Sequence, residues 1–246
     1  MTPTRTAVVP DDGREPTYTG PVEDYLKAIY ELERATGTAT TTDIANRLAI
    51  APASVTGMVR RLAGQRLLKH EPYRGVRLTP AGQRVALRTL RRHRVIETFL
   101  ARVLGYPWDA VHDEAERLEH AASDELVDRM AAALDEPTVD PHGAPIPSRD
   151  GTVADQHYAS IADLAPGQPA RLVCVSDDDP ARLRYLAELG LIPGARVIVL
   201  ARAPFEGPIS VRVGASDASA SHAIGPALAR AVLVEPVDAA TRIPDR

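Results

Sequence analysis

The stretch that decides the fold of the N-terminal part is residues 42–64, TDIANRLAIAPASVTGMVRRLAG. Apolar side chains recur at helical spacing on both sides of a break at residues 50–52, which predicts two helices joined by a short turn. Pro52 suits the first turn of the second helix. Residues 67–71 and 76–79 then predict two short strands with a turn between them. Helix, turn, helix and hairpin in this order predict a winged helix-turn-helix.

The rest of the chain divides into a helical part and a small β part. Helices are predicted over residues 22–35, from Thr79 to about Leu104 and from Asp109 to about Leu134. From Gln168 onward the apolar pattern changes to period two, which predicts a β-barrel of SH3 size. The fold class is therefore mainly α with a small β domain. We expect a tail at residues 1–17, a winged-helix domain at 18–86 and a helical domain at 87–140. A linker at 141–166, an SH3-like domain at 167–236 and a second tail at 237–246 follow.

Charge is distributed unevenly along the 246 residues, although the net charge is only −4. Residues 27–94 are rich in Lys and Arg, whereas residues 109–140 are rich in carboxylates. This indicates a nucleic-acid-binding face followed by a cation-binding region. The single cysteine, Cys174, excludes an intrachain disulfide. No apolar run approaches the roughly 20 residues that cross a bilayer, and the N-terminus does not read as a secretory signal. We expect a cytoplasmic protein without membrane contact.

The second helix of the helix-turn-helix is the one that enters the major groove of DNA in this motif. Its first exposed residues are small, which allows close approach and limits base readout to hydroxyl and methyl contacts. Arginines nearby are suited to phosphates and to the minor groove. The predicted DNA contacts are Ala51, Ala53, Ser54, Thr56, Gly57, Arg60 and Arg74. A winged helix that makes only protein contacts is the alternative.

Histidines and glutamates on two predicted helices form a second constellation. Their spacings place each set on one helix face. They are His93 and Glu97 on the first helix and His112, Glu116, Glu119 and His120 on the second. Imidazole and carboxylate ligands without thiolate suit Mn, Fe, Co or Zn. Six candidate ligands exceed the needs of one ion, so two sites are expected; the alternative is a charged, solvated helix face.

Several stretches resemble the diphtheria-toxin-repressor family, in particular its manganese-sensing branch, over roughly residues 18–236. They are YLKAIYEL (25–32), SVTGMV (54–59), YRGVRLT (73–79), RHR (92–94), VHDEAERLEHAASDE (111–125), GAPIP (143–147) and LGLIPG (189–194). The resemblance implies a helical dimerisation domain between the winged helix and the SH3-like domain. It also implies a non-enzymatic homodimeric repressor that binds double-stranded operator DNA when Mn²⁺ or Fe²⁺ is plentiful and controls metal-uptake genes. One operator would take one dimer or two.

The same resemblance assigns the candidate ligands to two sites. The primary site would use Asp24, Glu116, Glu119 and His120, and the ancillary site His93, Glu97 and His112. The SH3-like domain often completes the ancillary site in this family. Within the run Asp177 to Asp179, Asp179 is the first candidate for that role.

Two positions bear on the identity of the metal. Asp24 and Glu116 stand where iron-sensing members have methionine and cysteine, and hard oxygen ligands favour Mn²⁺. Fe²⁺ remains an alternative, and Co²⁺ or Zn²⁺ would substitute in vitro. Lys27 stands where manganese repressors without an SH3-like domain have a further carboxylate, so two separated sites are expected rather than a closely bridged pair.

Two other functions remain open from the sequence. One is a winged-helix regulator that senses an organic ligand, which metal-independent DNA binding would favour. The other is a metallohydrolase, because histidines and carboxylates also activate water. For the repressor, a metal ion bound both by Asp24 and by the ligands at residues 116–120 would set the angle between the DNA-binding half and the dimerisation half of the chain. This would favour the DNA-binding state.

Overall fold

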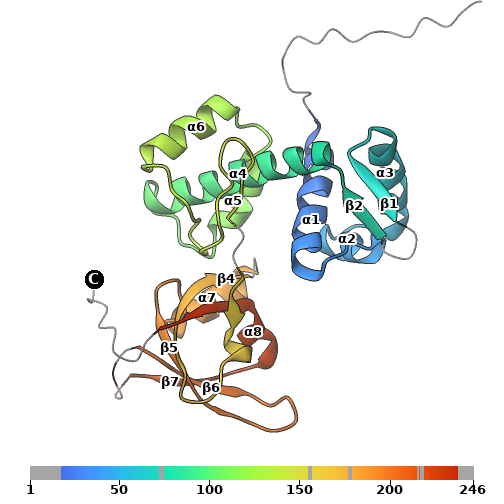
Figure 1. The fold of residues 1–246 in the computed structure, drawn as a ribbon. Coiled ribbons are helices and arrows are strands. Elements are labelled where there is room, and N and C mark those ends of the chain that lie inside the picture. Colours follow the sequence, from blue (N-terminus) through green and yellow to red (C-terminus); the bar gives the residue numbers. More distant parts are fainter. Residues whose placement is uncertain are drawn as a thin grey trace, which may run out of the picture. The chain divides into compact units, whose positions relative to one another are not determined.

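The computed structural model describes residues 18–71, 75–154, 157–176, 179–214, 216 and 219–237 (Figure 1). The chain divides into two units, residues 1–83 and 84–246. Within the described ranges, no helix combines the length and the hydropathy that crossing a membrane requires.

The first unit is a winged helix, as predicted. Its elements are α1 (Gly20–Thr36), α2 (Thr41–Arg47), α3 (Pro52–Gly64), β1 (Leu68–Glu71) and β2 (Gly75–Leu78). Thr40 and Asp43 form a capping box at the start of α2, in which each side chain accepts from the other residue's backbone N–H. The two strands are antiparallel, with Leu68 opposite Leu78.

The hairpin is held against the helices by a close backbone contact. Gly75 has φ +84°, and a Cβ at this position would lie 2.3 Å from the carbonyl oxygen of Ala39. The neighbouring Val76 donates its N–H to the same oxygen at 2.9 Å. Only glycine satisfies both the left-handed backbone and the contact, so this residue determines where the hairpin sits.

The helical part of the second unit differs from the prediction at one point. The long helix α4 (Pro80–Arg102) is followed by α5 (Val111–Leu118) and α6 (Asp124–Ala133), where one helix from Asp109 to Leu134 was predicted. That prediction was wrong because Ser123 is extended and its hydroxyl accepts from the N–H of Leu126. A serine N-cap followed by acidic residues starts a new helix, and continuous apolar spacing masked this signal.

Arginines of α4 hold the other helices and the following segment in place. Arg92 pairs with Asp124 at 2.9 Å, which joins α4 to α6. Arg94 donates to the carbonyl oxygen of Pro145 at 2.5 Å. His142 and Ile146 are buried, although their surroundings were interpreted as the start of a linker. The prolines that suggested a linker supply carbonyl acceptors: Pro145 for Arg94 and Pro147 for Arg91.

The C-terminal part is a six-stranded antiparallel sheet with short helices. Its strands are β3 (Ala159–Ser160), β4 (Pro169–Val175), β5 (Arg196–Arg202), β6 (Ile209–Val213), β7 (Ser221–Ile224) and β8 (Val232–Pro236), in the order β3-β8-β4-β5-β6-β7. The helices are η1 (Ile161–Asp163), α7 (Pro180–Glu188) and α8 (Pro226–Ala231). The four longer stretches of period two are strands as predicted; β3, β7 and α8 were not predicted, because such short elements carry little periodicity.

Candidate metal centre and DNA-binding face

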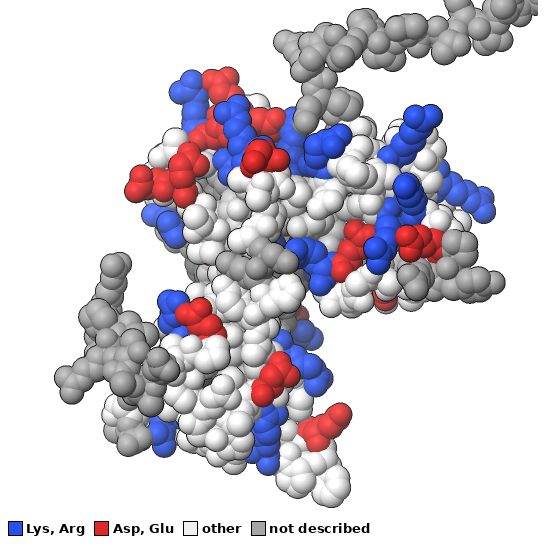
Figure 2. All heavy atoms as spheres, viewed as in Figure 1, with Lys and Arg blue, Asp and Glu red and all other residues white. Residues whose placement is uncertain are grey.

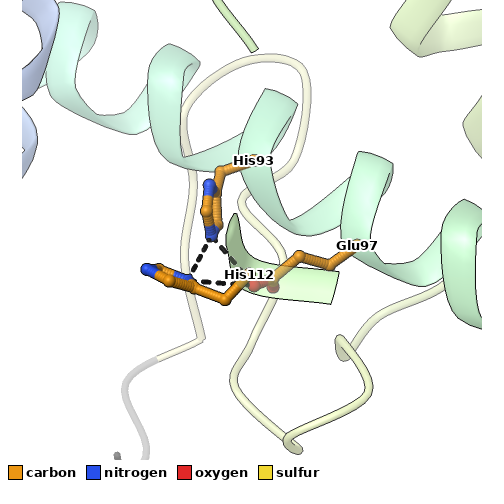
Figure 3. A group of neighbouring side chains, drawn as sticks. All are labelled: His93, Glu97 and His112. Atoms are coloured by element: carbon orange, nitrogen blue, oxygen red, sulfur yellow. Dashed lines mark hydrogen bonds and ion pairs between the residues drawn. The ribbon is translucent and has the colours of Figure 1, made fainter. Parts of the chain in front are cut away.

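Helices α4 and α5 bring two imidazoles and a carboxylate together. Figure 3 shows His93 and Glu97 extending from consecutive turns of α4 toward His112 of α5. His93 Nε2 lies 2.9 Å from Glu97 Oε1 and 3.0 Å from His112 Nδ1. Glu97 Oε1 lies 3.3 Å from His112 Nδ1. Three possible ligand atoms thus converge on one point.

The Glu97 carboxylate is held in its charged form. The side chain is 2% exposed, and this burial alone would raise its pKa. Electrostatic interaction with His93 and hydrogen bonds with His112 and His93 outweigh burial and lower the pKa of Glu97 below its usual value. An ionised carboxylate beside two imidazoles is a ligand set that suits Mn²⁺, Fe²⁺ or Zn²⁺.

His93 also contacts the ligands predicted for the primary site. Its Nδ1 lies 2.6 Å from Oε2 of Glu119, which caps the C-terminus of α5 and is fully buried. Glu116 Oε1 is 3.7 Å from the same nitrogen. The other oxygen of Glu119 lies 3.5 Å from His120 Nε2. The two predicted ligand sets of the second unit therefore adjoin at a single imidazole.

Two further predicted metal ligands belong to α1 and to the start of α7. Asp24 is half-buried on α1 in the first unit. Asp179 is exposed and caps α7, where its Oδ1 accepts from the N–H groups of Ala181 and Arg182 at 2.8 and 3.3 Å. Its neighbours Asp177 and Asp178 lie outside the described residues.

Two residues that the sequence analysis did not select, Asp140 and His142, adjoin the cluster. With Glu97 they form another buried group whose ligand atoms lie within 4.8 Å of one another. His142 Nε2 is 2.8 Å from the carbonyl oxygen of Trp108. Since a carbonyl only accepts, Nε2 donates to it, and Nδ1, 4.0 Å from Glu97 Oε2, is the ring nitrogen that could bind a metal. The signal for these residues was the sequence Asp-Pro-His-Gly at 140–143, which spans the predicted boundary between the helical domain and the linker.

The electrostatics of Asp140 differ from those of Glu97. Burial and the nearby charge of Glu97 raise the pKa of Asp140, although Arg94 opposes the shift. Its Oδ1 also accepts from the N–H groups of His142 and Ala144, at 2.8 and 3.0 Å. Asp140 therefore fixes the turn that carries His142.

The proposed DNA-contact residues of α3 lie on its solvent face. Those described are all exposed: Ala51, Ala53, Ser54, Thr56, Gly57 and Arg60. Val55, Val59 and Leu62 are buried on the opposite face. A Cβ at Gly57 would meet nothing within 4 Å. The backbone of α3 is therefore accessible at this position and could lie close to DNA. Arg74 lies outside the described residues. Basic side chains project from the part of the chain that holds α2, α3 and the hairpin (Figure 2).

Comparison with known families covers most of the chain. Residues 18–76 match "Iron dependent repressor, N-terminal DNA binding domain", and residues 79–148 match "Iron dependent repressor, metal binding and dimerisation domain". Residues 159–236 match the FeoA domain.

Individual relatives bear iron- and manganese-related names. The chain is 33% identical over 189 residues to the iron-dependent repressor IdeR of Mycobacterium leprae, spanning 72% of this chain and 82% of that protein. It is 40% identical over 109 residues to the regulator MntR of Bacillus pumilus, spanning 44% of this chain and 75% of that protein. A solved manganese-dependent transcriptional repressor in complex with manganese superposes with a TM-score of 0.80 at 40% identity, covering 88% of this chain and 100% of that one.

Proposed function

Because this chain belongs to the diphtheria-toxin-repressor family of iron- and manganese-dependent transcriptional repressors, we propose that it is a Mn²⁺-activated repressor of metal-uptake genes. Members of this family are DNA-binding proteins, not enzymes. The convergence of His93, Glu97 and His112, next to Glu116 and Glu119, is the main support for a metal-sensing role.

The ligands divide into two sets, which we assign by role. Asp24, Glu116, Glu119 and His120 would form the primary site. His93, Glu97 and His112 would form the ancillary site. Asp179 accepts two hydrogen bonds at the α7 N-cap through Oδ1, so Oδ2 is the oxygen that would bind a metal while the cap is kept. We propose that Asp140 and His142, which adjoin Glu97, extend the ancillary site, with Asp179 as a further candidate ligand.

The oxygen-rich ligand set favours manganese. Asp24 and Glu116 offer carboxylates, and Mn²⁺ prefers oxygen and imidazole ligands to sulfur. Fe²⁺ is the competing ion, since relatives named for iron and for manganese are both similar to this chain. Co²⁺ and Zn²⁺ would substitute in vitro.

Residues from both units would act together in the switch. A bound divalent cation supplies positive charge that offsets the mutual repulsion of the carboxylates. Asp24 belongs to the first unit and Glu116, Glu119 and His120 to the second, so all four can be ligands together only in a restricted set of orientations. If that set includes the DNA-binding arrangement, cation binding shifts the population toward it. The two recognition helices of a dimer then meet successive major grooves about 34 Å apart.

Exposed apolar residues at the ends of α4 and α5 provide a candidate dimer face. Val103, Leu104 and Leu118 are 51%, 57% and 39% exposed. Buried side chains of the same helices, among them Leu100 and Val111, form one hydrophobic core cluster. We propose that the exposed face forms the homodimer contact and that one or two such dimers occupy each operator. The protein would act in the cytoplasm.

Operator binding tests the function directly. Fluorescence anisotropy with promoter DNA from manganese- and iron-uptake genes would be measured with Mn²⁺, Fe²⁺ under anaerobic conditions, Zn²⁺ or EDTA. Salt must be constant, because phosphate contacts make affinity strongly salt-dependent. We expect tight binding with Mn²⁺ and little with EDTA.

Matched variants separate the metal centre from general effects. Glu119→Gln should abolish Mn²⁺-dependent binding, since Glu119 is fully buried against His93. Glu125→Gln makes the same change at a side chain of α6 that is 76% exposed, and should bind as the unmodified protein does. Equal operator binding with Mn²⁺ and with EDTA would contradict the proposal and favour a regulator of organic-ligand type.

A further inference from the structure

Three arginines lie on one face of the C-terminal sheet. Arg171 of β4, Arg196 of β5 and Arg212 of β6 each adjoin residues that belong to the hydrophobic core of this domain. Successive side chains of a strand point to opposite faces of the sheet, so the three arginines share the face away from this core, the outer face. Arg171 is directly opposite Arg196, and Arg212 is opposite Ile198, the next outer-face residue of β5.

Negative charge is scarce on this outer face. Glu235 of β8 is the single carboxylate in the sequence of strands β3 to β8, and it lies opposite Arg171. Its Oε1 accepts from Arg171 Nε at 2.9 Å and also from Arg171 Nη2. Glu235 is therefore bound by Arg171, two strands away from Arg196. Like charges directly opposite each other destabilise a sheet, so an anion between Arg171 and Arg196 would stabilise it.

Arg196 has a donor that the fold itself does not satisfy. The side chain is half-buried, and its Nε is enclosed without a hydrogen-bond acceptor in the described part of the chain. Arg202 of the same strand differs, because its Nη2 donates to the carbonyl oxygens of Ile161 and Leu164 at 3.4 and 2.5 Å. Buried side-chain donors nearly always have a partner in proteins, so the Arg196 N–H group is suited to a ligand that accepts hydrogen bonds.

We propose that Arg196, with Arg171 and Arg212 beside it, binds a phosphate group on the outer face of the sheet. The planar guanidinium group matches the spacing of phosphate oxygens. Three arginines against the one carboxylate of Glu235 leave an excess of positive charge. A phosphate monoester, with a charge of about −1.5 to −2 at pH 7, balances this excess better than a single carboxylate does. The ligand is therefore a small phosphorylated molecule or free phosphate, and a DNA backbone is the other source of the same chemistry.

The Nε–H signal of Arg196 tests the site directly. Isotope-labelled full-length protein would be titrated with sodium phosphate in EDTA at constant ionic strength, and arginine Nε–H signals would be followed by NMR. Arg196→Met identifies the signal and removes the guanidinium group. Arg230→Met is the matched control, because Arg230 is exposed and lies on α8, outside the sheet. Isothermal titration calorimetry would give the phosphate affinity of each protein.

We expect phosphate to shift the Arg196 Nε–H signal of the unmodified protein. Arg196→Met should weaken phosphate binding at this site by about tenfold or more, the loss typical of a charge-assisted hydrogen bond, and Arg230→Met should leave it unchanged. If Arg196→Met does not fold, as judged by circular dichroism, Arg196→Lys replaces it. Lysine retains the charge but lacks the planar fork, so the change should have the same direction.

Two further ligands distinguish the sources of the phosphate and exclude other anions. If Arg196→Met also weakens binding to a non-operator DNA duplex and lowers the salt slope by about one, the phosphate belongs to a DNA backbone. Unchanged DNA affinity assigns the site to a small phosphorylated molecule, and either result supports the proposal. Acetate that shifts the Arg196 signal as readily as phosphate would overturn it in favour of a carboxylate ligand.

Two results would overturn the proposal outright. One is an Arg196 Nε–H signal that phosphate does not move, which would mean that water satisfies this donor. The other is an unchanged phosphate affinity in Arg196→Met. All these measurements are made without a divalent cation, so their failure would leave the proposed metal-sensing function untouched.

Discussion

Replacing Glu97 with glutamine removes one negative charge from the centre of the ligand cluster while retaining the side-chain shape. The carboxylate contacts His93 and His112 through one oxygen and lies 4.0 Å from His142 through the other. An amide offers one oxygen, so its nitrogen must face one of these two sides, where it cannot bind a cation. Glu97 belongs to both the His112 group and the His142 group, so the substitution affects both.

The size of the effect follows from the lost charge-assisted interaction. Such an interaction contributes about 1.5–3 kcal/mol, and each 1.4 kcal/mol is about a factor of ten in affinity. We therefore expect Mn²⁺ to bind about 10- to 100-fold more weakly to Glu97→Gln. At a Mn²⁺ concentration of about 100 times the original Kd, the ligand adds about 2.7 kcal/mol to the free energy of unfolding. A 30-fold weaker Kd reduces this addition to about 0.9 kcal/mol at the same concentration.

Urea unfolding in Mn²⁺ and in EDTA measures this difference. Each protein is compared with itself, so a change in the stability of the metal-free form cancels. Glu125→Gln, the same substitution at an exposed position of α6, should retain the full increment. If Glu97→Gln gains as much stability from Mn²⁺ as the unmodified protein, Glu97 is not a ligand and the assignment of the ancillary site is wrong.

Three further predictions concern DNA binding, stability and assembly. Arg60→Ala removes an exposed cation from α3. DNA affinity should fall similarly for all sequences, and the slope of log affinity against log salt concentration should decrease by about one. An unchanged slope in an anisotropy salt series would exclude a phosphate contact. Hydrogen bonds and charge from Arg88 and Arg92 outweigh burial and lower the pKa of Asp124 below its usual 3.8. A carboxylate whose pKa is lower in the folded than in the unfolded protein stabilises the fold at pH values above its unfolded pKa, and this stabilisation is lost as the pH falls. The difference in unfolding free energy between the unmodified protein and Asp124→Asn, measured in urea, should therefore shrink below about pH 4. A difference that does not change with pH would contradict the ion pairs. Leu118→Asp places a charge on the proposed dimer face, and sedimentation should show a shift to monomer; a stable dimer would place the interface elsewhere.

Local features of the sequence were sufficient for the winged helix and for part of the metal cluster. The turn at residues 50–52 and the alternating strands depend on neighbours within a few positions, where periodicity and capping act. His93 and Glu97 share a helix face because they are four residues apart. Even so, continuous apolar spacing concealed the N-cap at Ser123 and merged α5 with α6.

The tertiary structure decided which distant residues share a site. His142 lies beside Glu97 because Arg94 binds a proline carbonyl and β4 packs on Gly143, contacts between segments far apart in the chain. No local pattern distinguishes such a turn from a linker, since both are rich in proline and glycine. Asp179 likewise has the side chain of a ligand, and the structure adds that its Oδ1 accepts from two backbone N–H groups at the start of α7. Residue type and spacing identify which groups can bind a metal, whereas packing determines which of them converge.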